Sequence, residues 1–178
     1  WVGGISFAAR ADWKEMGLGL RGSLRSLWVL AIVLALSPLS LLVAASLHTL
    51  HRLYGQPPGW FHASGYFAWA ILQQFILQDV GLLRLLRLTA SKRRAVAAAA
   101  VLFALAHLPN PLLTGLTLAW GALACLIFLR YRGLFTLGLV HGLLGLCVAI
   151  TVPNAVHHHM RVGLGYLTYR QPELKTGP

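Results

Sequence analysis

Residues 27–50 read LWVLAIVLALSPLSLLVAASLHTL, an uncharged run in which apolar side chains predominate. A helix needs about 20 such residues to cross the hydrocarbon core of a bilayer. Because the run is long enough, it predicts a transmembrane helix, and Pro38 inside it predicts a kink. This stretch therefore indicates a membrane protein rather than a soluble domain.

The composition of the 178-residue chain agrees with that prediction. Hydrophobic residues make up 57% of the chain and charged residues only 11%, whereas soluble domains carry roughly 25% charged residues. The mean hydropathy is +0.68. The predicted fold class is therefore all-α, a multi-spanning transmembrane helix bundle of about five spans with interfacial termini.

Turn signals and apolar runs divide the chain. Four further runs predict four further spans, at about residues 64–83, 95–107, 112–129 and 134–152. Prolines separate two pairs of runs, because proline stops helices. The predicted organisation is an interfacial N-terminal segment, a transmembrane bundle and a polar or interfacial tail, at residues 1–26, 27–152 and 153–178.

Basic residues predict the orientation in the membrane. Fifteen Lys and Arg stand against four Asp and Glu, a formal net charge of +11. They flank apolar runs without the aromatic interleaving that strand-binding proteins use, so we expect contact with membrane lipids and no nucleic acid. With a cytoplasmic N-terminus, eleven basic residues lie inside and four outside. This asymmetry places residues 84–94 in the cytoplasm and residues 157–159 outside.

A few polar side chains lie inside the predicted spans. Such groups are costly in hydrocarbon, so they normally face the bundle interior and often mark a site. Five qualify: Gln73, Gln74 and Gln78 in the second span, His107 in the third and His141 in the fifth. At ~1.5 Å per residue, the glutamine pair and the histidines lie roughly 11–18 Å from the cytoplasmic ends of their helices. Their similar depth predicts one shared intramembrane site.

Each of these residues also has a structural interpretation. A lone glutamine or histidine in a span often serves only as an interhelical hydrogen-bond partner, worth about 1 kcal/mol. Asp79 is five residues beyond Gln74, a spacing that points it away from that residue's face of an α-helix. We therefore interpret Asp79 as an interfacial partner of Arg84 or Arg87 in preference to a replacement base.

Other residues are interpreted as packing or surface groups. Histidines 157–159 are assigned to an interfacial tail in preference to a metal site. Cys125 and Cys147 show no metal-ligand spacing and are assigned to helix packing. Small residues recur along the last span, at Gly138, Gly142 and Gly145. This spacing predicts a face for close helix packing.

Three segments carry a resemblance to a known family. They are QQFILQDVGLLRLL, FALAHLPNP and LGLVHGLLG, at residues 73–86, 103–111 and 137–145. In order, spacing and helix placement they resemble the motifs of the CPBP group of intramembrane proteases, over about residues 64–152. That group includes the CAAX prenyl endopeptidases and the bacteriocin-immunity (Abi) proteins. Its motifs are Glu-Glu-x-x-x-Arg, Phe-x-x-x-His, and a His followed four positions later by Asn or a similar residue.

The motifs are matched unequally. The second is present as Phe103 and His107, and the third keeps its histidine but has Gly145 at the Asn position. The first motif is degenerate. Gln73 and Gln74 replace the two glutamates, and Gln78 stands where the arginine belongs.

The resemblance implies a hydrolase, an intramembrane endopeptidase acting on membrane-associated peptides or proteins. The residues that it implies for catalysis are His107, His141, Gln73, Gln74 and Gln78. It also implies that His107 and His141 hold a divalent metal such as zinc, in a multi-pass protein of the bacterial inner membrane. In the family the first glutamate activates the attacking water, and glutamine has no group that titrates near neutral pH to do so.

Two alternatives from other classes remain. The first is a catalytically silent pseudoprotease that binds a membrane peptide or a partner membrane protein. The second is a small transport or channel subunit, for which an internal repeat is typical and none is found in this sequence. A carboxylate reaching the site would discriminate the protease from the pseudoprotease. The sequence predicts no oligomeric state.

Overall fold

The computed structural model describes residues 13–50 and 59–169, with side chains described from residue 64 onward in the second range. The helices in chain order are α2 (Leu20–Arg25), α3 (Leu27–Ser46), α4 (Gly59–Phe75), α5 (Leu83–Leu88), α6 (Lys92–Leu105), α7 (Pro111–Tyr131), α8 (Leu134–Thr151), α9 (Asn154–His157) and α10 (Leu164–Leu167). A π-helix, η1 (Ile76–Leu82), joins α4 to α5, and a 3₁₀ turn, η2 (His158–Met160), follows α9. The described residues contain no strand, so the predicted all-α class is confirmed.

The predicted number of five spans is too high. Among the described helices, α3, α7 and α8 are long and apolar enough to cross a membrane. The predicted third span is the 14-residue helix α6, about 21 Å long against a hydrocarbon core of about 30 Å. It is short because the turn around Pro109 and Pro111 ends it. The predicted second span is divided between α4, which has 17 residues, and the π-helix η1.

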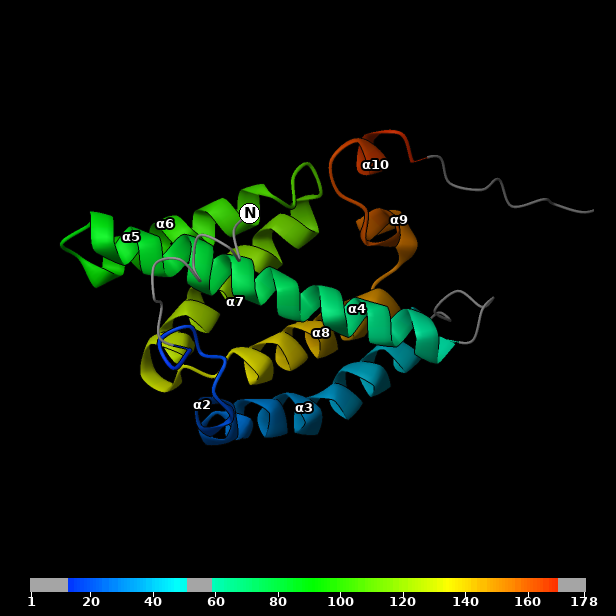
Figure 1. Cartoon of the computed structure of the whole chain (residues 1–178). Helices are drawn as coiled ribbons and strands as arrows, with labels where there is room; N and C mark the ends of the chain where they lie inside the picture. The colour runs from blue at the N-terminus through cyan, green and yellow to red at the C-terminus, as the bar shows by residue number, and fades with distance from the viewer. Residues whose placement is uncertain (1–12, 51–58, 170–178) are drawn as a thin grey trace, which may run out of the picture.

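The long helices pack in two groups that are joined by η1. Helix α8 lies between α3 and α4, and α6 packs along α7 (Figure 1). The η1 segment contacts α6 and α7, and thereby joins the α4–α8 pair to the α6–α7 pair. The glycine face predicted on α8 is the surface on which α4 packs: a Cβ at residue 138 would lie 2.8 Å from Cα of Ile71.

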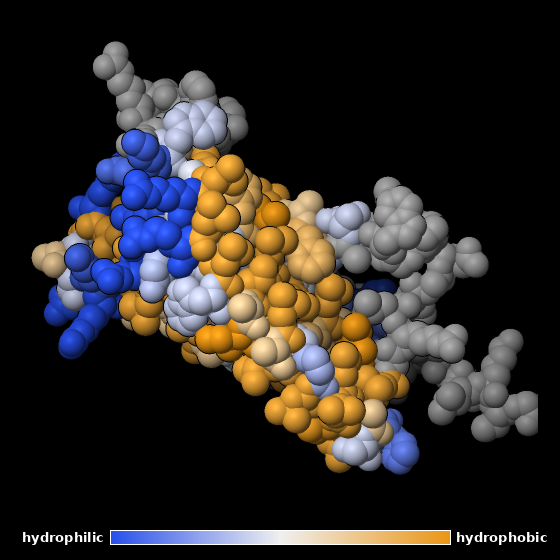
Figure 2. All heavy atoms as spheres, turned by 90° about the horizontal axis from the view of Figure 1, so that it is seen from below, coloured by the Kyte–Doolittle hydropathy of each residue, from blue (hydrophilic) through white to orange (hydrophobic). Residues whose placement is uncertain are grey.

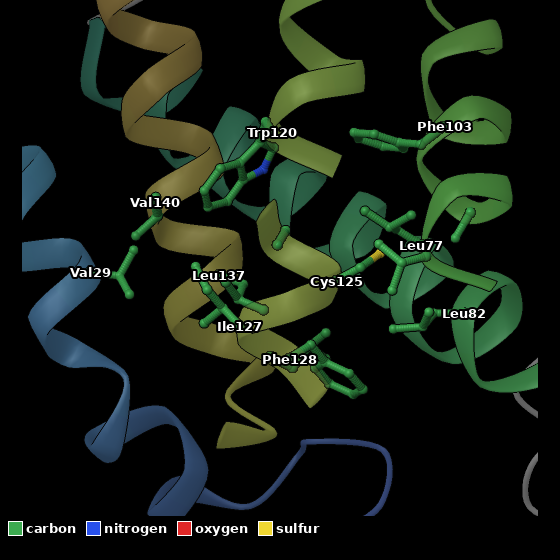
Figure 3. Packing of buried hydrophobic residues seen from close by; sticks show 14 of the residues in the cluster. Val29, Leu77, Leu82, Phe103, Trp120, Cys125, Ile127, Phe128, Leu137 and Val140 are labelled. Carbon is green, nitrogen blue, oxygen red and sulfur yellow. The ribbon is translucent and has the colours of Figure 1, made fainter. Parts of the chain in front are cut away.

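An apolar core fills the space between these groups. Leu82 of η1, Phe128 of α7 and Leu137 of α8 are fully buried, and Cys125 and Val140 belong to the same cluster (Figure 3). Cys125 packs as a buried apolar residue, as its place in a span predicts. The core therefore holds η1, α7 and α8 together.

The surface divides by polarity along the bundle. Apolar side chains cover the middle, and hydrophilic residues gather at one end (Figure 2). The exposed basic residues of the α5–α6 connection are Arg84, Arg87, Lys92, Arg93 and Arg94. Exposed leucines such as Leu36 and Leu42 on α3 belong to the apolar surface. This is the surface that a membrane-embedded helix bundle presents to lipid.

The N-terminal segment packs on the α7–α8 turn. Residues 1–12 lie outside the described part of the chain. Of the rest, the Arg132 guanidinium donates a hydrogen bond to the Glu15 carbonyl at 2.8 Å, and the Thr136 hydroxyl donates to the Ser23 carbonyl at 2.7 Å. Gly22 allows this approach, since a Cβ there would collide with backbone oxygens of the turn. Residues 13–26 are therefore packed against the bundle and not merely interfacial.

The predicted tail is partly folded. Residues 154–167 form α9, η2 and α10, while residues 170–178 lie outside the described part of the chain. Within this segment His157 is buried, with Nε2 donating to the Val152 carbonyl and Nδ1 accepting from the Met160 amide. His158 stacks on Tyr166 at a centroid distance of 4.2 Å. The three histidines thus pack within the tail's own fold.

Candidate intramembrane site

The glutamines of the second predicted span are placed by the junction of α4 and η1. Gln74 and Gln78 are fully buried. They are four residues apart and share a helix face, and the Gln78 Nε2 amide donates to Gln74 Oε1 at 3.2 Å. Gln73 is half-buried, and it forms no hydrogen bond within the part of the chain that the structure describes. The inward-facing glutamine is therefore Gln74.

Gln74 also bonds across to α8. Its Nε2 lies 3.1 Å from Nδ1 of His141, in a contact buried on both sides. An amide nitrogen can only donate, so Nδ1 of His141 accepts. In a neutral imidazole the other nitrogen then carries the proton, and Nε2 of His141 is a donor directed away from Gln74. The hydrogen bonds run in one direction, from Gln78 to Gln74 to His141.

His107 is held in the opposite sense. It lies in the turn after α6, and its Nδ1 is 2.8 Å from the Phe103 carbonyl. A carbonyl oxygen only accepts, so Nδ1 donates and Nε2 of the neutral ring is left as an acceptor. Both histidines are buried, with 8% and 7% exposure for His107 and His141. Neither faces lipid.

One aromatic ring connects the two histidines. The Phe103 ring meets His107 edge-on at a centroid distance of 5.0 Å and His141 at 5.7 Å. Phe103 lies one turn before His107 on α6, so the sequence spacing of the second motif places this ring beside the imidazole. The site therefore combines a donor from α8 and an acceptor from the turn after α6 around a shared phenyl ring.

The π-helix changes the position of Asp79. Its bonds run from residue i to i+5, as in the Leu83 amide donating to the Gln78 carbonyl, and such segments occur frequently at functional sites. Asp79 is 6% exposed, and neither carboxylate oxygen has a hydrogen-bond partner among the described residues. The interpretation of Asp79 as a partner of Arg84 or Arg87 is therefore wrong, because the π-helix turns it into the bundle.

Sequence reasoning missed two residues that frame the site. Trp120 of α7 lies 6.4 Å from the His141 ring, and its indole N–H is buried without a partner in the described part of the chain. Figure 3 shows it between α8 and α6. Its spacing of three from Thr117, another buried residue, was a weak signal.

Asn110 is the second missed residue. It is fully buried, caps α7 by accepting from the Leu113 amide at 3.1 Å, and donates to the carbonyls of His157 and Arg161 at 2.9 and 3.1 Å. The Leu108 carbonyl accepts a further bond from the Gly163 amide at 2.8 Å. The turn that carries His107 is thus tied to the C-terminal segment. Asn between two prolines was its only signal in the sequence.

The donor set does not fit a zinc ion. Catalytic zinc sites use three protein ligands, mostly His, Glu, Asp or Cys. No group of three such residues comes together among the residues that the structure describes. In the hydrogen-bond arrangement above, His141 also has a proton on its free nitrogen, so only His107 offers a lone pair.

Comparison with known proteins supports the predicted family resemblance. The fold and the site define an α-helical integral membrane protein with buried polar groups between its helices. Residues 66–147, a little under half of the chain, match the family model described as type II CAAX prenyl endopeptidase Rce1-like. All three motif segments lie inside the match, so the predicted resemblance to this family is confirmed. No curated protein and no solved structure matches the chain.

Proposed function

We propose that this protein binds a membrane-associated peptide at the Gln74–His141–His107 site and, as its sequence stands, hydrolyses it slowly or not at all. The observation that carries the proposal is the 3.1 Å bond between Gln74 and His141. It joins two helices at a buried site inside the family-matched segment. The family description names endopeptidases of prenylated CAAX proteins, so a prenylated C-terminal peptide is the proposed ligand.

The histidines provide complementary contacts for a peptide group. Nε2–H of His141 can donate to a backbone carbonyl, and Nε2 of His107 can accept from a backbone amide or a water molecule. A peptide bond offers one acceptor and one donor, so this pair matches it. In a buried site each such bond contributes about 0.5–1.5 kcal/mol.

The hydrolytic step lacks its base at the family positions. Gln73 and Gln74 can donate and accept hydrogen bonds, but they do not titrate near neutral pH. Gln74 is already committed to His141 and Gln78. The site therefore supports recognition more strongly than turnover, which favours the pseudoprotease alternative over an efficient hydrolase.

Binding of a defined probe tests this proposal. A fluorescent, prenylated peptide ending in Cys–aliphatic–aliphatic–X would be titrated against the protein in lipid nanodiscs by anisotropy. We expect His141→Ala to weaken binding up to about tenfold, the equivalent of one buried hydrogen bond. His48→Ala, a change at an exposed histidine outside the site, is the control. Equal affinity of His141→Ala and the unmodified protein would contradict the proposal.

One observation favours a second function, that of an active endopeptidase. Asp79 is a buried carboxylate without a hydrogen-bond partner among the described residues, next in sequence to a glutamine of the site. If it supplies the base, the unmodified protein cleaves the peptide and Asp79→Asn abolishes cleavage while binding persists. If turnover is negligible in both proteins, the binding function stands alone.

The membrane and orientation are also proposals. We infer a multi-pass protein of the bacterial inner membrane with the basic end of the bundle in the cytoplasm. The gathering of the 84–94 basic residues at one end supports this, since cytoplasmic loops are enriched in Lys and Arg (Figure 2).

A further inference from the structure

Three glycines of α8 receive three side chains of α4. Ile71 packs over Gly138, Phe67 over Gly142 and Tyr66 over Gly145. Two of the three side chains that fill these gaps are apolar. The third, Tyr66, brings a hydroxyl group into the interface between α4 and α8.

The Tyr66 hydroxyl occupies the space of the missing side chain at position 145. A Cβ on Gly145 would overlap the hydroxyl oxygen and would lie 2.8 Å from Cζ of the ring. No side chain larger than hydrogen fits there while Tyr66 keeps its place. A polar atom therefore stands at this position of the third motif, supplied by α4 instead of α8.

This position is close to His141. Residues four apart on a helix have Cβ atoms about 5–6 Å apart and share a face. The hydroxyl lies where the Cβ of residue 145 would be, so it is roughly 6 Å from the Cβ of His141.

The hydroxyl has no partner in the described part of the chain. Tyr66 is only partly exposed, and no described residue forms a hydrogen bond with it. Its oxygen is not among the buried side-chain atoms that lack a partner in the described part of the chain, so a ligand can reach it. The hydroxyl is a donor without a partner among the described residues, it lies near His141, and Gly145 makes room for its ring. These features indicate that the hydroxyl contacts a ligand.

We propose that Tyr66 is a peptide-binding residue whose hydroxyl donates a hydrogen bond to a backbone carbonyl of the ligand beside His141. The proposal rests on the peptide-binding function proposed above. It adds a second donor from a different helix to the Nε2–H of His141. The ligand group that Tyr66 recognises is an amide carbonyl, and no bond is made or broken.

Peptide isosteres test the contact directly. Each of the last three amides of the prenylated peptide is replaced in turn by a trans-alkene, which keeps the shape and removes the carbonyl acceptor. Tyr66→Phe should weaken binding of the normal peptide about three- to tenfold, the range for one hydrogen bond. For one member of the alkene series this loss should disappear. Tyr131→Phe, at a tyrosine that packs on Trp28 far from the site, should bind every peptide as the unmodified protein does.

Two glycine variants separate hydrogen bonding from packing. Gly145→Ala displaces the Tyr66 ring and should lose the same discrimination between amide and alkene. Gly142→Ala displaces Phe67 in the same interface and should keep the discrimination, even if overall affinity falls.

The outcomes are distinct. If Tyr66→Phe weakens binding of all the peptides equally, or of none, Tyr66 makes no carbonyl contact and the inference is wrong while the binding function stands. If the unmodified protein binds no peptide, both proposals fail.

Discussion

Replacing the three glutamines by the family residues, in Gln73→Glu/Gln74→Glu/Gln78→Arg, should convert this site from a binding site into a peptidase. A carboxylate at position 74 can only accept, so Nδ1 of His141 must change from acceptor to donor. Its Nε2 then becomes a lone-pair acceptor, as Nε2 of His107 already is. A carboxylate at position 73 supplies a base on a side chain that is half-buried and not committed to another hydrogen bond in the described part of the chain.

Two opposing effects decide the outcome, a gain in reaction rate and a loss of stability. General-base assistance contributes 10²- to 10⁴-fold in rate, which is about 3–5 kcal/mol of activation free energy. A buried charge without its partner costs about 3–5 kcal/mol of stability. Since Gln74 is fully buried and 3.2 Å from Gln78, Gln74→Glu alone should unfold the protein at a markedly lower temperature. Adding Gln78→Arg should restore most of that loss.

The assay is cleavage of the prenylated peptide in nanodiscs, followed by mass spectrometry. We expect product from the triple variant at least about a hundredfold faster than from the unmodified protein, and loss of that gain on adding His107→Ala. Thermal unfolding of each variant serves as the folding control. Rapid cleavage by the unmodified protein, abolished by His107→Ala, would refute the reasoning, and Asp79 would then be the first group to test as the base.

Three further predictions follow from the fold. Asn110→Ala should destabilise the protein by about 2–3 kcal/mol, since it removes the cap of α7 and two hydrogen bonds to the C-terminal segment. Hydrogen exchange in residues 157–169 should become faster, and unchanged exchange there would contradict the role of Asn110 in holding that segment. Asp79→Asn should raise the melting temperature, because it removes a buried carboxylate without a hydrogen-bond partner among the described residues, and a lower melting temperature would show that the carboxylate is stabilising. In a cysteine-free background, Lys92→Cys should react with impermeant thiol reagents only after permeabilisation and His159→Cys without it, whereas the reverse pattern would invert the topology.

Local sequence predicts many of the helices of this protein and some of their shared faces. Apolar runs such as that of α3 predict membrane helices because the bilayer removes water from every backbone group that is not bonded within the helix. Proline chemistry predicts the end of α6, which the structure places at Leu105. The same local spacing predicts that Gln74 and Gln78 share a face, and that Phe103 lies beside His107.

Tertiary structure decides what depends on the phase and register of neighbouring helices. Whether Gln73 or Gln74 faces His141 cannot be read from adjacent positions, and the α4–α8 contact selects Gln74. Asp79 is buried because the wider turn of the π-helix η1 directs it into the bundle, whereas α-helical spacing points it elsewhere. The local sequence did not predict this π-helix. The hydroxyl of Tyr66 reaches the space above Gly145 only because close glycine contacts bring two helices together, 79 positions apart in sequence. The sequence by itself determined a membrane bundle with polar residues at similar depth, and only the packing of its helices determined which of their atoms meet.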